Sequence, residues 1–136
     1  MRNKKIDALI HQMENYSECW KQFSRYLNAA RSKHFDQNDE TQFLELKSLI
    51  TQELELILAA IECSSPKKAE VHSLLGSAPS IRYLSELSEG ALRGLENQWH
   101  KIYIAWQCNL GQLKVQQRQL QSQSILSSLL FRKKSA

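Results

Sequence analysis

The sequence predicts an all-α protein, an antiparallel bundle of three long helices (about 4–34, 39–62 and 88–120) with short crossover helices (about 66–75 and 80–87). Only four glycines and two prolines occur in 136 residues, so few positions interrupt a helix. Apolar residues recur three and four positions apart over long stretches, which is the helical period. A chain of this length fits one domain. We assign residues 1–121 to the bundle and residues 122–136 to a C-terminal tail.

The first helix is predicted from an unbroken apolar pattern between residues 4 and 34. A strict 3.5-residue repeat over this length indicates left-handed packing at shallow angles. The pattern consists of Ile6, Leu9, Met13, Tyr16, Trp20, Phe23, Leu27 and Ala30.

The second helix follows a turn at 34–40, a segment rich in Asp and Asn. Asp39 and Gln42 resemble a capping box at its start. Its apolar stripe comprises Phe43, Leu46, Ile50, Leu54, Ile57 and Ile61. Four further leucines widen this stripe, so we expect neighbours to cover the helix on more than one side. They are Leu44, Leu49, Leu56 and Leu58.

The crossover between residues 66 and 87 is predicted as two short helices. Pro66 suits the first helical position, and Gly76 suits the position where the helix ends. A break at 77–80 precedes the second short helix. We expect this crossover to cover one end or flank of the bundle.

The third long helix has the strongest pattern, and we expect the rest of the chain to be organised around it. Residues seven apart form its stripe: Leu92, Trp99, Trp106, Leu113 and Leu120, with Leu95 and Ile102 between them. The stripes predict a buried core that includes Trp20, Phe23, Trp99, Ile102 and Trp106.

Two glycines near the start of this helix need a reason. Gly90 and Gly94 each cost about 1 kcal/mol relative to Ala in a helix interior. We expect another backbone to approach the helix closely there.

The tail carries the candidate binding residues. Residues 116–124 are polar, so we expect the helix to leave the bundle and fray there. An apolar cluster and three basic residues follow: Ile125, Leu126, Leu129, Leu130, Phe131, Arg132, Lys133 and Lys134. About two helical turns are not stable alone in water, so an ordered tail needs a partner. Three kinds of partner fit such a tail: another protein, an anionic membrane surface, or a second copy of the chain. An ordinary frayed tail without a partner is an alternative of equal weight.

The charges are segregated along the chain. Residues 36–65 hold one basic and seven acidic residues (−6), whereas residues 89–136 hold seven basic and two acidic residues (+5). In a bundle we expect Glu45, Glu53 and Glu55 to lie against basic residues of the first or last long helix. Such neutralisation disfavours nucleic-acid binding, because phosphates need uncompensated Lys and Arg on one face.

No pattern of residues predicts catalysis, a cofactor or a metal site. Glu96 and His100 lie four apart, but this spacing matches no metal-binding helix motif and predicts a surface pair. The cysteines are odd in number and widely spaced, which predicts free thiols, with Cys19 and Cys108 at the edge of the core. No apolar run approaches the ~20 residues of a membrane span. We expect a cytoplasmic protein that is not an enzyme.

These features predict a non-enzymatic protein that acts by binding another protein, as an adaptor. In helix lengths and layout the chain resembles the helical export chaperones of flagellar and type III secretion systems. That resemblance implies an export-chaperone-like role. The alternatives are a ribosome- or RNA-associated factor that uses the basic ends and an enzyme whose site converges from separate helices.

Overall fold

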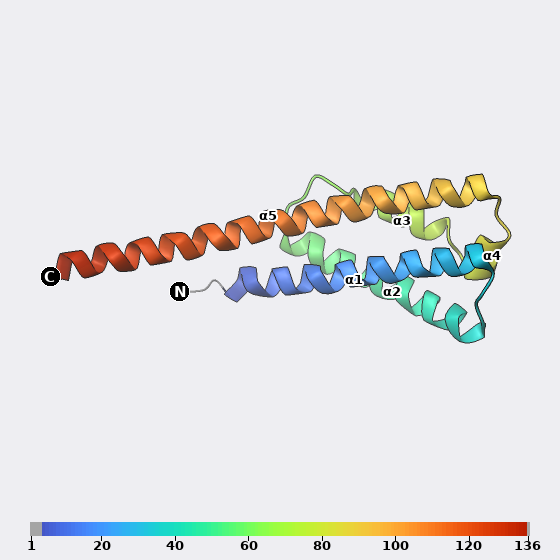
Figure 1. Ribbon diagram of the computed structural model, residues 1–136, viewed down its shortest axis with the longest axis horizontal. Coiled ribbons are helices and arrows are strands. Elements are labelled where there is room, and N and C mark those ends of the chain that lie inside the picture. Colours follow the sequence, from blue (N-terminus) through green and yellow to red (C-terminus); the bar gives the residue numbers. More distant parts are fainter. Residues whose placement is uncertain (1–3, 136) are drawn as a thin grey trace.

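The computed structural model describes the backbone of residues 4–135 and the side chains of residues 4–130. This part of the chain folds into helices without a strand: α1 (Lys4–Ser32), α2 (Gln37–Ala60), α3 (Lys68–Gly76), α4 (Ile81–Ser85) and α5 (Glu89–Ser135). The all-α bundle is confirmed. α1 runs antiparallel to both α2 and α5 (Figure 1).

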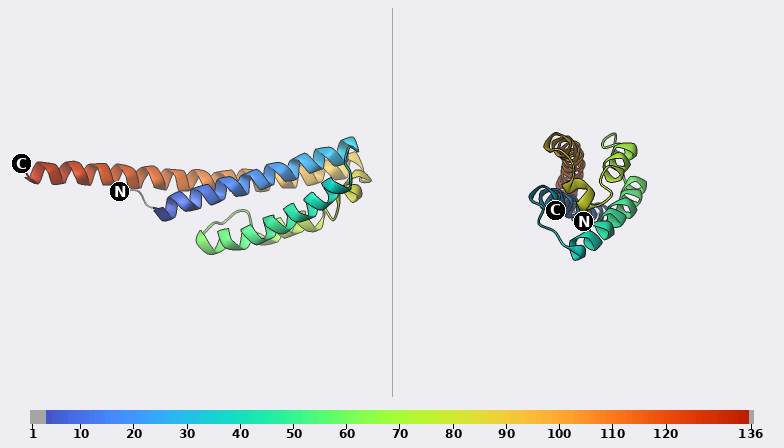
Figure 2. Two further views of the ribbon diagram at one scale, coloured as in Figure 1. Left: turned by 90° about the horizontal axis from the view of Figure 1, so that it is seen from below. Right: turned by 90° about the vertical axis from the view of Figure 1, so that its right-hand side faces the viewer.

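The helix with the most extensive packing is α1, which lies against α5, α2 and α4. Seen end-on, α5, α1, α2 and α3 occupy four corners, with α3 between α2 and α5 (Figure 2). The expectation that the chain is organised around the last long helix was therefore wrong. The reason is geometric, because α5 buries one stripe whereas α1 is covered from several sides.

An aromatic cluster forms the centre of the core. Trp20, Phe23 and Trp106 are fully buried, as predicted, and so is Phe43. The Tyr16 ring lies edge-on to the Trp106 ring, with centroids 5.1 Å apart. The Tyr16 hydroxyl also donates a hydrogen bond to the Ile50 carbonyl at 3.3 Å. The cluster thus joins α1 to both α2 and α5.

Trp99 is only half-buried, which differs from the prediction. It lies at the edge of the contact between α1 and α5, where its indole N–H donates to the Trp20 carbonyl at 2.8 Å. Its ring stacks on Tyr103, with centroids 5.0 Å apart. An indole in this position combines apolar contact with a satisfied polar group.

The start of α2 is capped by Asp36 rather than by Asp39. The Asp36 carboxylate accepts from the Asp39 N–H at 2.9 Å, and the Asp39 carboxylate accepts from the Asp36 N–H at 3.0 Å. The capping box was therefore predicted three residues too late.

α2 also stabilises α4, because the Glu40 carboxylate accepts from the N–H groups of Ile81 and Arg82 at 3.2 and 2.7 Å.

Two expectations about helix breakers need correction. α3 begins at Lys68, so Pro66 lies in the preceding loop rather than in the first turn. Gly90 and Gly94 face open space, and a Cβ atom on either would meet nothing within 4 Å. No neighbouring backbone within the described residues explains these two glycines.

Replacing Trp106 with Ala should lower the free energy of unfolding by about 3–5 kcal/mol, because a fully buried aromatic ring is lost. Chemical denaturation followed by far-UV circular dichroism measures the change. Ile104→Ala is the matched control, since Ile104 is 52% exposed on the same helix and should cost no more than about 0.5 kcal/mol. Equal effects of the two substitutions would contradict the packing described above.

Candidate interaction surface

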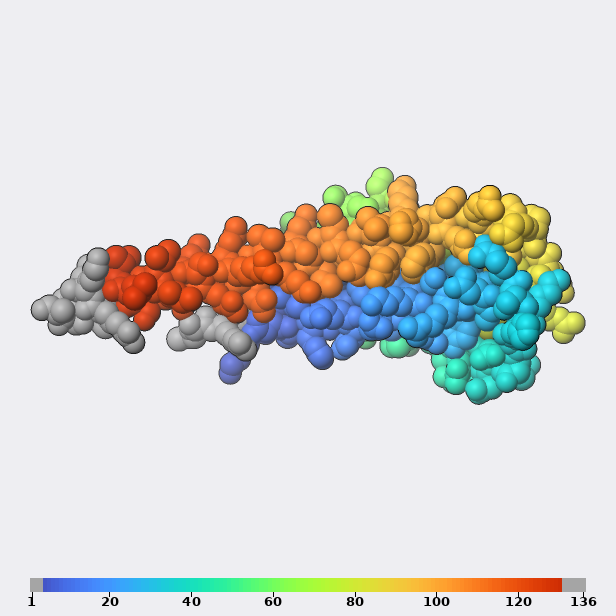
Figure 3. Space-filling view, viewed as in Figure 1, coloured from blue at the N-terminus to red at the C-terminus, as the bar shows by residue number. Residues whose placement is uncertain are grey.

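The most prominent feature of the surface is the length of α5. The helix continues to Ser135 instead of ending near residue 120, and it projects past the rest of the bundle (Figures 1 and 3). The prediction of fraying was wrong because no Gly or Pro follows Gly111, and Gln, Leu, Lys and Arg favour helix. Polar composition reduced the packing of this segment without interrupting the helix.

Packing against α5 decreases towards its C-terminus. Leu113 is buried, and Gln117 donates a hydrogen bond to the Asp7 carboxylate of α1 at 2.7 Å. Leu120 and Ser124 are half-buried. From residue 125 the predicted binding residues are well exposed: Ile125 62%, Leu126 59%, Leu129 53% and Leu130 61%.

These four residues share one side of α5. At 3.6 residues per turn they cover an arc of about 140°, opposite the side on which Trp106 and Leu113 face the core. Ile104 and Val115 lie on the same side and are also exposed. A shallow hollow lined by Val115, Ser122 and Leu126 connects the two groups. We call these six apolar residues the outer stripe: Ile104, Val115, Ile125, Leu126, Leu129 and Leu130.

The remaining predicted binding residues are Phe131, Arg132, Lys133 and Lys134. Their backbone belongs to α5, which brings them next to the outer stripe along the chain. Their side chains lie outside the described residues.

A second set of exposed leucines lies on α2. Leu44, Leu49 and Leu56 are 53%, 44% and 57% exposed, so the expectation that neighbours cover them was wrong. α2 occupies a corner of the bundle and buries only the stripe that runs from Phe43 to Ile57. Leu49 and Leu56 are seven residues apart and share one flank of α2, whereas Leu44 lies on the opposite flank.

Among the described side chains, Glu53 and Glu55 do not pair with the basic residues of α1 or α5 that we expected beside them. The Glu53 carboxylate accepts from Gln12 at 3.4 Å, and Glu55 forms an ion pair with Lys68 of α3. α2 and α5 occupy diagonal corners, which separates their charges (Figure 2). Arg31 of α1 instead pairs with Glu89 and Glu96 at the start of α5.

Glu96 and His100, the pair considered for metal binding, each have another neighbour. Glu96 binds Arg31, and the His100 ring lies beside Trp99, with centroids 6.2 Å apart. Within the described residues, no cluster of three or more His, Cys, Asp or Glu side chains could hold a metal ion. A hollow of about 390 Å³ between α3 and α5 is lined by Glu70 and Lys101 among others.

Comparison with known proteins gives no relative for this chain. No protein-family model, curated protein or solved structure matches it. In the part of the chain that the structure describes, no helix has an apolar stretch long enough to span a bilayer.

Deleting residues 122–136 should lower the free energy of unfolding by less than about 1 kcal/mol. For scale, this is no more than one ordinary hydrogen bond contributes. The physical reason is that Ile125, Leu126, Leu129 and Leu130 are exposed and bury little apolar area. Urea denaturation in dilute solution, followed by tryptophan fluorescence, measures the change. A loss of several kcal/mol would show that this segment belongs to the core.

Cys108 should react with iodoacetamide several times faster than Cys19 and Cys63, as measured by mass spectrometry of the modified peptides. Cys108 is exposed on the outer side of α5, contrary to the expectation that it lies at the edge of the core. Burial raises the pKa of the Cys19 and Cys63 thiols, which lowers the thiolate fraction near neutral pH. Equal rates at all three cysteines in the folded protein would contradict this description.

Proposed function

We propose that the protein is a non-enzymatic adaptor, or export-chaperone-like protein, that binds another protein through the projecting part of α5. The observation that supports this proposal is the exposure of Ile125, Leu126, Leu129 and Leu130 on one side of a helix. Large apolar residues gathered in one place on a surface mark interaction sites in soluble proteins.

The spacing of these residues suits recognition of a helix by a groove. Ile125 and Leu129 are four apart, Leu126 and Leu130 are four apart, and Leu126 and Leu129 are three apart. This is the pattern with which an amphipathic helix inserts its apolar side chains into a partner. Each leucine that becomes fully buried contributes about 1.5–3 kcal/mol. The segment is already part of α5, which reduces the entropic cost of ordering it on binding.

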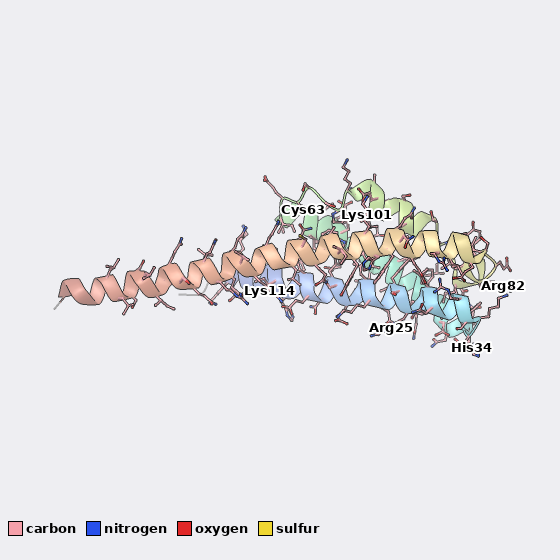
Figure 4. All side chains as sticks on the ribbon, turned by 45° about the horizontal axis from the view of Figure 1, so that its top comes forward. Arg25, His34, Cys63, Arg82, Lys101 and Lys114 are labelled. Atoms are coloured by element: carbon pink, nitrogen blue, oxygen red, sulfur yellow. The ribbon has the colours of Figure 1, made fainter. Side chains whose placement is uncertain are left out.

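An RNA- or ribosome-associated role is the second candidate, and one observation favours it. Residues 97–136 contain six Lys and Arg residues and no Asp or Glu. The described basic side chains are nevertheless dispersed, since Lys101 and Lys114 lie about 140° apart around α5. Arg25 and Arg82 lie on other elements (Figure 4). A protein partner with an acidic rim therefore fits this surface better than a nucleic acid.

Affinity purification from the native cells should recover a specific protein with the wild-type chain. Leu126→Ser combined with Leu129→Ser should reduce that recovery about tenfold or more, because two apolar contacts are lost. Leu44→Ser is the matched control, since it removes an equally exposed leucine from α2 and should leave recovery unchanged.

Two results would contradict the proposal. The first is unchanged recovery with the Leu126 and Leu129 variant. The second is a salt-dependent shift of RNA in a gel without a recovered protein, which would favour the RNA-associated role.

A further inference from the structure

Two parts of the chain carry net charges of equal magnitude and opposite sign. Residues 36–65, which include α2, hold seven acidic residues and one basic residue, a net charge of −6. Residues 97–136, which include most of α5, hold six basic residues and no acidic one, a net charge of +6. The two parts meet where Asn109 of α5 donates to the Ser65 carbonyl at 2.9 Å, whereas Glu53 accepts from Gln12 of α1 and Glu55 pairs with Lys68 of α3. The two regions are therefore complementary in net charge, and these two carboxylates pair with neither Lys nor Arg of α5.

Each of these regions also presents apolar side chains to solvent. On α2, Leu49 and Leu56 are exposed on one flank, with Glu45 and Glu53 near them on the helix. On α5, the outer stripe ends in the four exposed residues of the projecting segment. An acidic flank with two exposed leucines thus matches a segment that has four exposed apolar residues and whose sequence contains basic but no acidic residues.

The chain cannot join these two surfaces within one molecule. Ala60 at the end of α2 lines the same hollow as Gln112 and Gln116 of α5. From there α5 continues away from α2 (Figure 1). Residues 117–135 extend roughly 28 Å further at 1.5 Å per residue. The α2 helix of the same molecule therefore lies out of reach of this segment.

We propose that the projecting segment of α5 docks on the Leu49 and Leu56 flank of α2 in a second copy of the chain. The proposal rests on the same exposed segment as the proposed function, and it identifies what covers that segment when no other partner is bound. Two reciprocal contacts of this kind close a symmetric dimer.

The direction of the helices agrees with this arrangement. α2 and α5 run the same way along the bundle (Figure 1), so a two-fold axis across the long axis sets each projecting segment antiparallel to α2 of its partner. In antiparallel helices the positive and negative ends of the helix dipoles lie side by side. The segment of roughly 28 Å is comparable to the ~36 Å of the 24-residue α2.

Sedimentation equilibrium of the full chain tests the proposal. At about 100 μM, far above the Kd of a specific dimer, the mass should be twice the 15.8 kDa of one chain. The Kd should rise several-fold from ~0.1 M to ~1 M salt, because the Debye length falls from about 10 Å to 3 Å. Both Leu49→Ser with Leu56→Ser and Leu126→Ser with Leu129→Ser should give monomers, whereas Leu44→Ser should remain dimeric.

Mixing the two monomeric variants provides a further check. A copy with an intact α2 and a copy with an intact α5 can form one of the two contacts, so the mixture should yield a dimer that neither variant forms alone. All these substitutions replace exposed side chains, and circular dichroism verifies that the fold is kept.

A wild-type chain that stays monomeric would overturn the proposal. A dimer that is lost in the α5 variant but kept in the α2 variant would overturn it as well, because α5 would then pair with something other than α2. The proposed function is tested separately: the α2 variant keeps the projecting segment, so it should still recover the protein partner even if no dimer exists.

Discussion

The packing of α1 against its neighbours around Tyr16, Trp20 and Trp106 is the constraint on which the rest of the structure depends. Tyr16 contacts Trp106 of α5 with its ring and α2 with its hydroxyl. Burial raises the pKa of Tyr16 well above its usual value, so its hydroxyl stays protonated and remains a donor. The indole N–H groups of Trp20 and Trp106 find no acceptor among the described residues. Each such group costs about 1–3 kcal/mol, which the burial of two large rings has to offset.

The sequence predicts those parts of the fold that depend on local periodicity. Apolar spacing correctly located the buried side of each long helix, including Trp20, Phe23 and Trp106. It did not reveal that α1 makes the most extensive contacts, because a stripe reports that a helix face is buried but not how widely its neighbours cover it. For the same reason Leu49 and Leu56 were expected to be covered. Only the corner position of α2 in the bundle decides their exposure.

The candidate surface was predicted in composition but not in conformation. The exposure of Ile125 and Leu129 follows from their place beyond the bundle. Their helical conformation was missed because a polar segment suggests fraying, whereas helix formation requires only good helix formers and a helix from which to propagate. Continuing an existing helix avoids the cost of nucleation. The position of Ile104 and Val115 on the same side then follows from the geometry of one continuous helix.

The continuity of α5 from the core to its tip has a mechanical consequence. The bundle fixes both the distance of the outer stripe from Trp106 and the angle at which it points, since no hinge lies between them in the helix. An insertion of one residue near Gln119 would rotate the tip by about 100° and shift it by ~1.5 Å, whereas an insertion of seven would nearly restore the angle. The number of residues between Gln117 and Ser124 therefore sets the position and direction of the four exposed apolar residues at the tip of α5.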